Sequence, residues 1–106
     1  MSDYDRRQLV LMSSQIESYR QGQLDLATLI QRLEGLLNAL ESVEQSWKEA
    51  FHEDWFTLEQ VFAVSLDRPG KHVIDHSKEI LQEALGNLAH LVTDQLERMP
   101  EPSADD

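Results

Sequence analysis

Asp75, His76 and Ser77 have the side-chain types of a hydrolytic triad, and they follow one another directly in the sequence. A triad needs its three groups to converge, whereas neighbouring residues of a helix or turn point in different directions, so this adjacency argues against one. Glu49 and Glu53 are spaced as a carboxylate pair on one helical face, but nothing in the sequence marks a water-excluding cleft around them. The four glycines stand apart, so no glycine-rich phosphate loop is present. We therefore expect that the protein is not an enzyme.

Metal binding is suggested by one spacing only. His72 and His76 lie four residues apart, which suits two imidazoles on one helical turn, and Asp75 lies between them. The pair straddles the expected start of a helix, however, and no HExxH pattern surrounds it. The chain has no cysteine, which excludes disulfides and thiolate metal sites. We interpret the histidines as solvated and expect no metal and no cofactor.

Residues 41–66 combine acidic and aromatic side chains. Six acids and one lysine give this stretch a balance of −5, whereas three acids and three bases cancel in residues 1–20. Trp55 and Phe56 are neighbours and cannot point the same way from a helix, so one of them should reach the surface; the sequence leaves open which one. An exposed aromatic residue ringed by acids has the composition of a binding hot spot. The candidate partner-binding residues are Glu49, Glu53, Asp54, Trp55, Phe56 and Glu59. A purely solvated helix face is an equally weighted interpretation of the acids.

The whole chain of 106 residues has twenty acids against nine bases, a net charge of −11. This charge disfavours direct binding to nucleic acid or an anionic membrane and favours a basic protein partner, although acidity that only confers solubility is an alternative. No stretch approaches the ~18 apolar residues of a membrane span, and the N-terminal residues lack the apolar run of a secretory signal. We expect a cytoplasmic protein that does not enter membranes.

Apolar residues recur at helical spacing, and no segment alternates like a strand. Helices are predicted over about 5–20, from the N-cap Asp25 to about 40, over about 44–66, and from Asp75 or Ser77 to about 98. Gly22 should end the first helix, and Pro69-Gly70 should break the chain before the last. Residues 1–99 are therefore predicted to form one all-α domain, an antiparallel bundle of about four helices, followed by a disordered acidic tail over 100–106.

The helical stripes also predict the core and the helix starts. Ser42 or Ser46 could begin the third helix with a capping box, and a bend near His52 could divide that helix in two. Ile80 is expected to face inward with the other apolar residues of the last helix. The predicted core residues are Leu29, Leu33, Leu36, Leu40, Phe62, Leu81, Leu85 and Leu88.

Three sequence features carry a family resemblance. They are Ile16-x-x-Tyr19-x-x-Gly22-x-Leu24, Ser46-Trp47-Lys48-Glu49 and Trp55-x-x-Leu58-Glu59-x-Val61-Phe62. In these features, and in size and charge, the chain resembles small acidic bacterial immunity proteins, those of the colicin D type and of contact-dependent growth inhibition systems. The resemblance covers most of residues 9–66. It implies an acidic face that blocks the basic cleft of a toxin domain, a nuclease in particular, by imitating nucleic-acid phosphates.

Two functions therefore follow as hypotheses. The first is an immunity-type inhibitor that binds a basic toxin domain through an acidic helical face. The second is a structural or regulatory helical adaptor that has no toxin partner and that could associate with itself. The sequence predicts neither the toxin's activity nor the oligomeric state.

Overall fold

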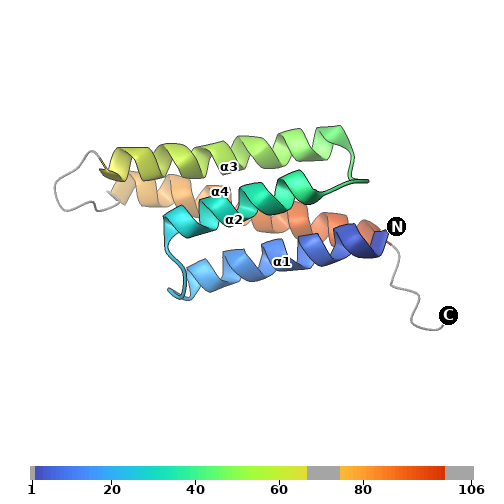
Figure 1. The fold of residues 1–106 in the computed structure, drawn as a ribbon. Coiled ribbons are helices and arrows are strands. Elements are labelled where there is room, and N and C mark those ends of the chain that lie inside the picture. The colour runs from blue at the N-terminus through green and yellow to red at the C-terminus, as the bar shows by residue number, and fades with distance from the viewer. Residues whose placement is uncertain (1, 67–74, 100–106) are drawn as a thin grey trace.

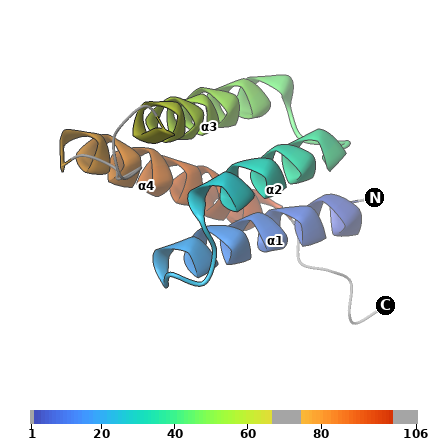
Figure 2. The ribbon, with the colours of Figure 1, turned by 60° about the vertical axis from the view of Figure 1, so that its left-hand side comes forward.

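The computed structural model describes residues 2–66 and 75–99, which form four α-helices (Figure 1). The helices are α1 (Ser2–Arg20), α2 (Leu26–Ala39), α3 (Gln45–Leu66) and α4 (Asp75–Arg98). Successive helices run in opposite directions, and each packs against two neighbours: α1 and α3 both contact α2 and α4 (Figures 1 and 2). The predicted all-α antiparallel four-helix bundle is confirmed. The predicted break at Pro69-Gly70, the predicted tail over 100–106 and the His72–His76 pair lie outside the residues whose side chains are described.

One hydrophobic core runs between the four helices. Six of the eight predicted core residues are buried, while Leu36 and Phe62 are partly buried and pack against the core. Ile80 was predicted to face inward, and this is wrong, because its side chain is 38% exposed at the edge of the α4 stripe. Val43 and Val61 are buried although the predicted apolar stripes did not include them. The apolar periodicity therefore gives the correct face of each helix, with errors at the margins of the stripes.

The ends of α1 and the start of α2 follow local chemistry. Gly22 adopts φ 78° and ends α1 as predicted, with the Gln23 N–H donating to Ser18 O at 2.9 Å and the Gly22 N–H to Tyr19 O at 3.0 Å. This pair of bonds is a Schellman motif, which needs a left-handed residue where glycine has no Cβ penalty. Asp25 caps α2 as predicted, because its carboxylate accepts the Thr28 N–H at 2.8 Å. That hydrogen bond lowers the pKa of Asp25.

Asp5 is a buried carboxylate that fixes the connection between α2 and α3. Its side chain is 1% exposed, and its two oxygens accept the backbone N–H groups of Glu41 at 3.0 Å and Ser42 at 2.7 Å. These donors lie in the α2–α3 loop, more than thirty residues away in the sequence. Because an unpaired buried carboxylate is costly, the two bonds hold this loop against α1.

The start of α1 and the caps considered for α3 differ from the sequence predictions, whereas α3 begins within one residue of its predicted start. α1 begins at Ser2, three residues before the predicted Asp5, so Asp5 lies inside the helix and faces the loop. α3 begins at Gln45, between the two serines predicted as caps, and the backbone N–H of Ser42 is bound by Asp5. The contact of Asp5 with Glu41 and Ser42 therefore determines the position of the α2–α3 loop. α3 continues to Leu66 as one helix, without the division considered near His52.

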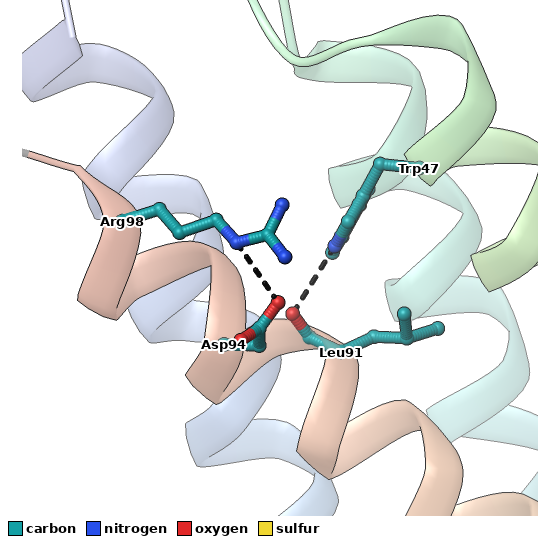
Figure 3. Close-up of polar contacts among 4 residues, drawn as sticks. All are labelled: Trp47, Leu91, Asp94 and Arg98. Atoms are coloured by element: carbon teal, nitrogen blue, oxygen red, sulfur yellow. Dashed lines mark hydrogen bonds and ion pairs between the residues drawn. The ribbon is translucent and has the colours of Figure 1, made fainter.

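Both tryptophans of α3 use their indole N–H groups to reach neighbouring helices. Trp47 Nε1 donates to Leu91 O of α4 at 3.1 Å, beside the ion pair of Arg98 Nε and Asp94 Oδ2 (Figure 3). Trp55 Nε1 donates to Ile30 O of α2 at 2.8 Å. A buried indole N–H requires such an acceptor, and a helical carbonyl retains a second lone pair to offer. α3 is thus tied to the helix on each side of it.

Replacing Leu33 by alanine tests the packing of α2. Leu33 is fully buried, so Leu33→Ala should lower the free energy of unfolding by about 2–5 kcal/mol, the range for emptying a packed leucine site. Urea denaturation followed by circular dichroism measures this loss. A loss below about 0.5 kcal/mol would place Leu33 at the surface and contradict the helix phase.

Replacing Asp5 tests the loop clamp. Asp5→Ala removes both acceptors and should cost about 1.5–3 kcal/mol, the range for a hydrogen bond to a charged group, since the freed N–H groups can regain water. Asp5→Asn keeps the shape and one acceptor oxygen, and should cost less than Asp5→Ala. Amide hydrogen exchange should quicken at Glu41 and Ser42 in Asp5→Ala. Unchanged exchange at these two amides would show that the carboxylate does not hold the loop.

Candidate functional site

The outward face of α3 carries most of the predicted partner-binding residues. The core stripe of this helix runs through Trp47, Phe51, Trp55 and Leu58, all of them buried. At about 100° per residue, the side opposite this stripe is the one that holds Glu49, Glu53 and Phe56. Residues three and four apart are neighbours on a helix, so the exposed Glu53 and Glu59 each lie one turn from Phe56. We call Glu49, Glu53, Phe56 and Glu59 the acidic face of α3.

The structure decides between the two neighbouring aromatic residues. Phe56 is 47% exposed, whereas Trp55 is 5% exposed and bonded to Ile30 O. Trp55 was a candidate contact residue, and its place in the core corrects that prediction. Phe56 is the aromatic side chain that a partner could reach. It also lines a shallow surface hollow with Glu59, Gln60, Phe62 and Ala63.

Asp54 belongs to a different surface. Its carboxylate is partly buried and turned toward α4, where its Oδ1 accepts the Nδ2–H of Asn87 at 3.2 Å. The two side chains line a small hollow with Thr57, Ile80 and Glu83 between α3 and α4. Asp54 was predicted with the other acids because it follows Glu53 directly, but one step along a helix rotates it by about 100°. The structure therefore does not bring it together with Phe56.

A groove beside the acidic face was not predicted from the sequence. It runs between α2 and α3, and its lining residues are Leu37, Asn38, Gln45, Lys48, Glu49, His52 and Glu53. His52 is exposed, and its ring lies 5.1 Å from the Trp55 ring, tilted by 32°. The helical spacing of His52 to Glu49 and Phe56 was available in the sequence and would have placed it beside this face. No local pattern in the sequence indicated that Leu37 and Asn38 of α2 would line the same groove.

Lys48 is the one base of residues 41–66, and it is directed to the end of α2. Its Nζ donates to Leu40 O at 3.0 Å, where the last carbonyls of α2 lack intrahelical donors. A cation there is also favoured by the helix dipole. Because Lys48 is held at this carbonyl, it does not pair with the carboxylates around Phe56, and the acidic face keeps its negative charge.

Another exposed hollow lies between α1 and α2. Its lining is mostly apolar and consists of Leu11, Gln15, Arg32, Gly35 and Leu36. Leu11 is 45% exposed, and nothing within the chain would contact a Cβ added at Gly35. The side chains of Gln15 and Arg32 are joined by a 2.8 Å hydrogen bond. This hollow is a smaller apolar surface without the acidic rim of α3.

The described part of the chain offers few groups for metal binding or catalysis. No three histidine, aspartate or glutamate side chains lie close enough there to hold a metal ion. Ser77 is buried, and the side chains of Asp75 and His76 lie outside the described residues. None of the four described helices has both the length and the apolar character that crossing a bilayer needs.

Comparison of the chain with models of protein families, with curated proteins and with solved structures finds no match. The resemblance to immunity proteins stays a hypothesis, which rests on the residues quoted for it and on the acidity of the chain.

A matched pair of substitutions tests the assignment of the two aromatic residues. Trp55→Phe removes the bond to Ile30 O and part of the buried ring, and should lower the free energy of unfolding by about 1–3 kcal/mol. Phe56→Ala changes an exposed side chain and should stay within about 0.5 kcal/mol of wild type. Both values come from denaturation followed by circular dichroism. The reverse order of the two losses would mean that α3 is rotated relative to this structure.

Proposed function

We propose that the protein is a binding module, not an enzyme, and that the acidic face of α3 docks on a basic surface of a partner protein. The observation that carries this proposal is the placement of Phe56. It is the aromatic residue of this helix that is held outward, and Glu49, Glu53 and Glu59 lie within one or two turns of it. Hot spots of protein interfaces combine a central aromatic anchor with a polar rim in this way.

The electrostatics of the chain support a basic partner. A net charge of −11 repels nucleic acid and anionic lipid and attracts a cationic surface. Complementary charge raises the association rate and disfavours wrong partners, while the anchor residue governs dissociation. In this proposal the glutamates of the acidic face raise the association rate, and Phe56 slows dissociation.

The more specific form of the proposal is an immunity-type inhibitor that acts in the cytoplasm on a basic toxin domain, a nuclease in particular. It is supported by the resemblance to immunity proteins together with the acidity of the face. Glutamate carboxylates would occupy the positions that substrate phosphates take in the toxin's cleft, and Phe56 would enter an apolar pocket beside them. Inhibition then follows from occupancy, without chemistry on this chain.

A self-associating adaptor is the second candidate, and the α1–α2 hollow is the observation that favours it. Leu11 is exposed there beside Gly35, whose missing side chain permits close approach of another surface. Light scattering over a range of concentrations separates the candidates. An adaptor of this kind should show a mass that rises with concentration, whereas the inhibitor should stay monomeric until the partner is added.

The binding proposal is tested with charge reversals on two helices. The partner captured from the source cells is purified, and its association and dissociation rates are measured with each variant. Glu49→Lys with Glu53→Lys should slow association about tenfold or more and flatten its salt dependence. Phe56→Ala should mainly speed dissociation and cost about 2 kcal/mol or more of affinity. Inhibition of the partner's own activity by one equivalent of this chain supports the immunity form.

Matched controls separate the acidic face from net charge. Glu79→Lys with Glu83→Lys has the same four-residue spacing on exposed positions of α4 and changes the net charge from −11 to −7, as the α3 reversal does. Val10→Ala removes an aliphatic side chain as exposed as Phe56. Val10→Ala should bind like wild type, and the α4 reversal should slow association much less than the α3 reversal does. Equal losses in the α3 and α4 reversals would reduce the effect to net charge, and wild-type binding by the α3 reversal would exclude this face.

A further inference from the structure

His52 is a titratable group beside the acidic face of α3 that the proposed function does not use. It lies one turn from both Glu49 and Phe56 on α3, next to Glu53 in sequence, and it lines the groove between α2 and α3. Histidine is the side-chain type that ordinarily changes its charge between about pH 5 and 8. Its position puts that change beside the residues that would meet a cation.

The imidazole has a rigid support. Its ring centroid is 5.1 Å from that of Trp55, and the rings are inclined by 32°. Trp55 is itself buried and bonded to Ile30 O at 2.8 Å, so it cannot turn away without breaking a core contact. A protonated imidazole is also attracted to a tryptophan ring. These contacts favour a position of His52 beside the acidic face in either protonation state.

The charged groups around His52 are few, and most are negative. On α3 they are Glu49, Glu53 and Lys48, whose Nζ donates to Leu40 O. On α2 the groove is lined by Leu37 and Asn38, which carry no charge. A proton on His52 therefore adds a positive charge to a small group of carboxylates, and no nearby arginine or second lysine lines the groove to mask it.

We propose that His52 makes docking on the acidic face proton-dependent, so that a basic partner binds well when His52 is neutral and weakly when it is protonated. This inference rests on the proposed function. With His52 neutral, the face presents the carboxylates of Glu49, Glu53 and Glu59. With His52 protonated, one of these charges is offset, and a cation stands one turn from Phe56, where the partner's own cations must approach. The affinity of the acidic face for a basic partner then depends on pH as well as on the partner's charge.

Linkage fixes the sign of the reciprocal effect. If protonation of His52 weakens binding of a cation, then binding of that cation must disfavour protonation of His52 by the same free energy. One unit of pKa corresponds to a tenfold change in affinity. A histidine pKa near ~6.5 is the reference for a solvated side chain, while glutamates near ~4.3 remain ionised above about pH 5.5. The interval from about pH 7.5 to about 5.5 therefore titrates histidine and leaves the carboxylates charged.

Hexa-arginine is the probe for the first experiment, because it supplies the cationic chemistry without an identified partner. Binding to the full chain is followed by NMR at low ionic strength, where charge interactions are least screened. Affinity should fall about three- to tenfold between about pH 7.5 and about pH 5.5. The imidazole signals of His52 should respond to hexa-arginine, whereas those of the exposed His90 on α4 should not.

Two variants give the controls. His52→Gln removes the titrating group and should bind hexa-arginine with the same affinity at both pH values. His90→Gln should keep the wild-type pH dependence. If His52→Gln also loses affinity at low pH, or if His90→Gln abolishes the pH dependence, the proposal is overturned.

The outcomes separate this inference from the proposed function. If the amide signals of Glu49, Glu53 and Phe56 respond to hexa-arginine with equal affinity at both pH values, docking on the acidic face is supported and the dependence on His52 is overturned. If these amides respond at neither pH, docking through charge complementarity fails, and the inference fails with it.

Discussion

The rotation of α3 about its axis is the constraint on which the rest of the structure depends. Two indole N–H groups, eight residues apart on this helix, donate to two different helices, from Trp47 to α4 and from Trp55 to α2. A rotation that kept one bond would break the other and bury an unpaired N–H group, at a cost of about 1–3 kcal/mol. The same rotation would expose Phe51, which stacks on Trp47 with ring centroids 5.3 Å apart. Because the tryptophans are fixed in the core, Phe56 and the glutamates around it must face outward.

The position of α3 along its axis depends on a second polar contact, the buried Asp5. By accepting the Glu41 and Ser42 N–H groups, Asp5 holds the chain between α2 and α3 against α1. α3 can then begin at Gln45, and the Lys48 Nζ donates to the backbone carbonyl of Leu40, the C-cap residue of α2. One carboxylate and one ammonium are thereby used for structure. The charges that remain on the outer side of α3 are negative.

The parts of this structure that follow from local sequence were predictable. Gly22 and Asp25 end and begin helices through contacts within five residues, and the leucine periodicity of α2 gives its buried face directly. The choice between Trp55 and Phe56 was left open, although a rotation of about 100° per residue places Trp55 on the stripe of Trp47, Phe51 and Leu58 and Phe56 on the opposite side, so the phase of the helix could have decided it. Asp5 was missed because its partners lie 36 and 37 residues away, so no local pattern marks it. The groove was missed for the same reason, because it is lined by side chains of both α2 and α3 and no local pattern marks it.

The placement of charge on α3 bears on whether its acids serve binding or only solvation. Glu49 and Glu53 are four residues apart, and like charges at this spacing destabilise a helix by about 0.2–0.5 kcal/mol. A surface that serves solubility alone mixes charges of both signs and needs no exposed aromatic side chain. On this helix the single lysine is held at the end of α2, and Phe56 stands among the carboxylates at 47% exposure. A surface that meets a cationic partner would use both features, and this is why we propose binding as the role of the acidic face.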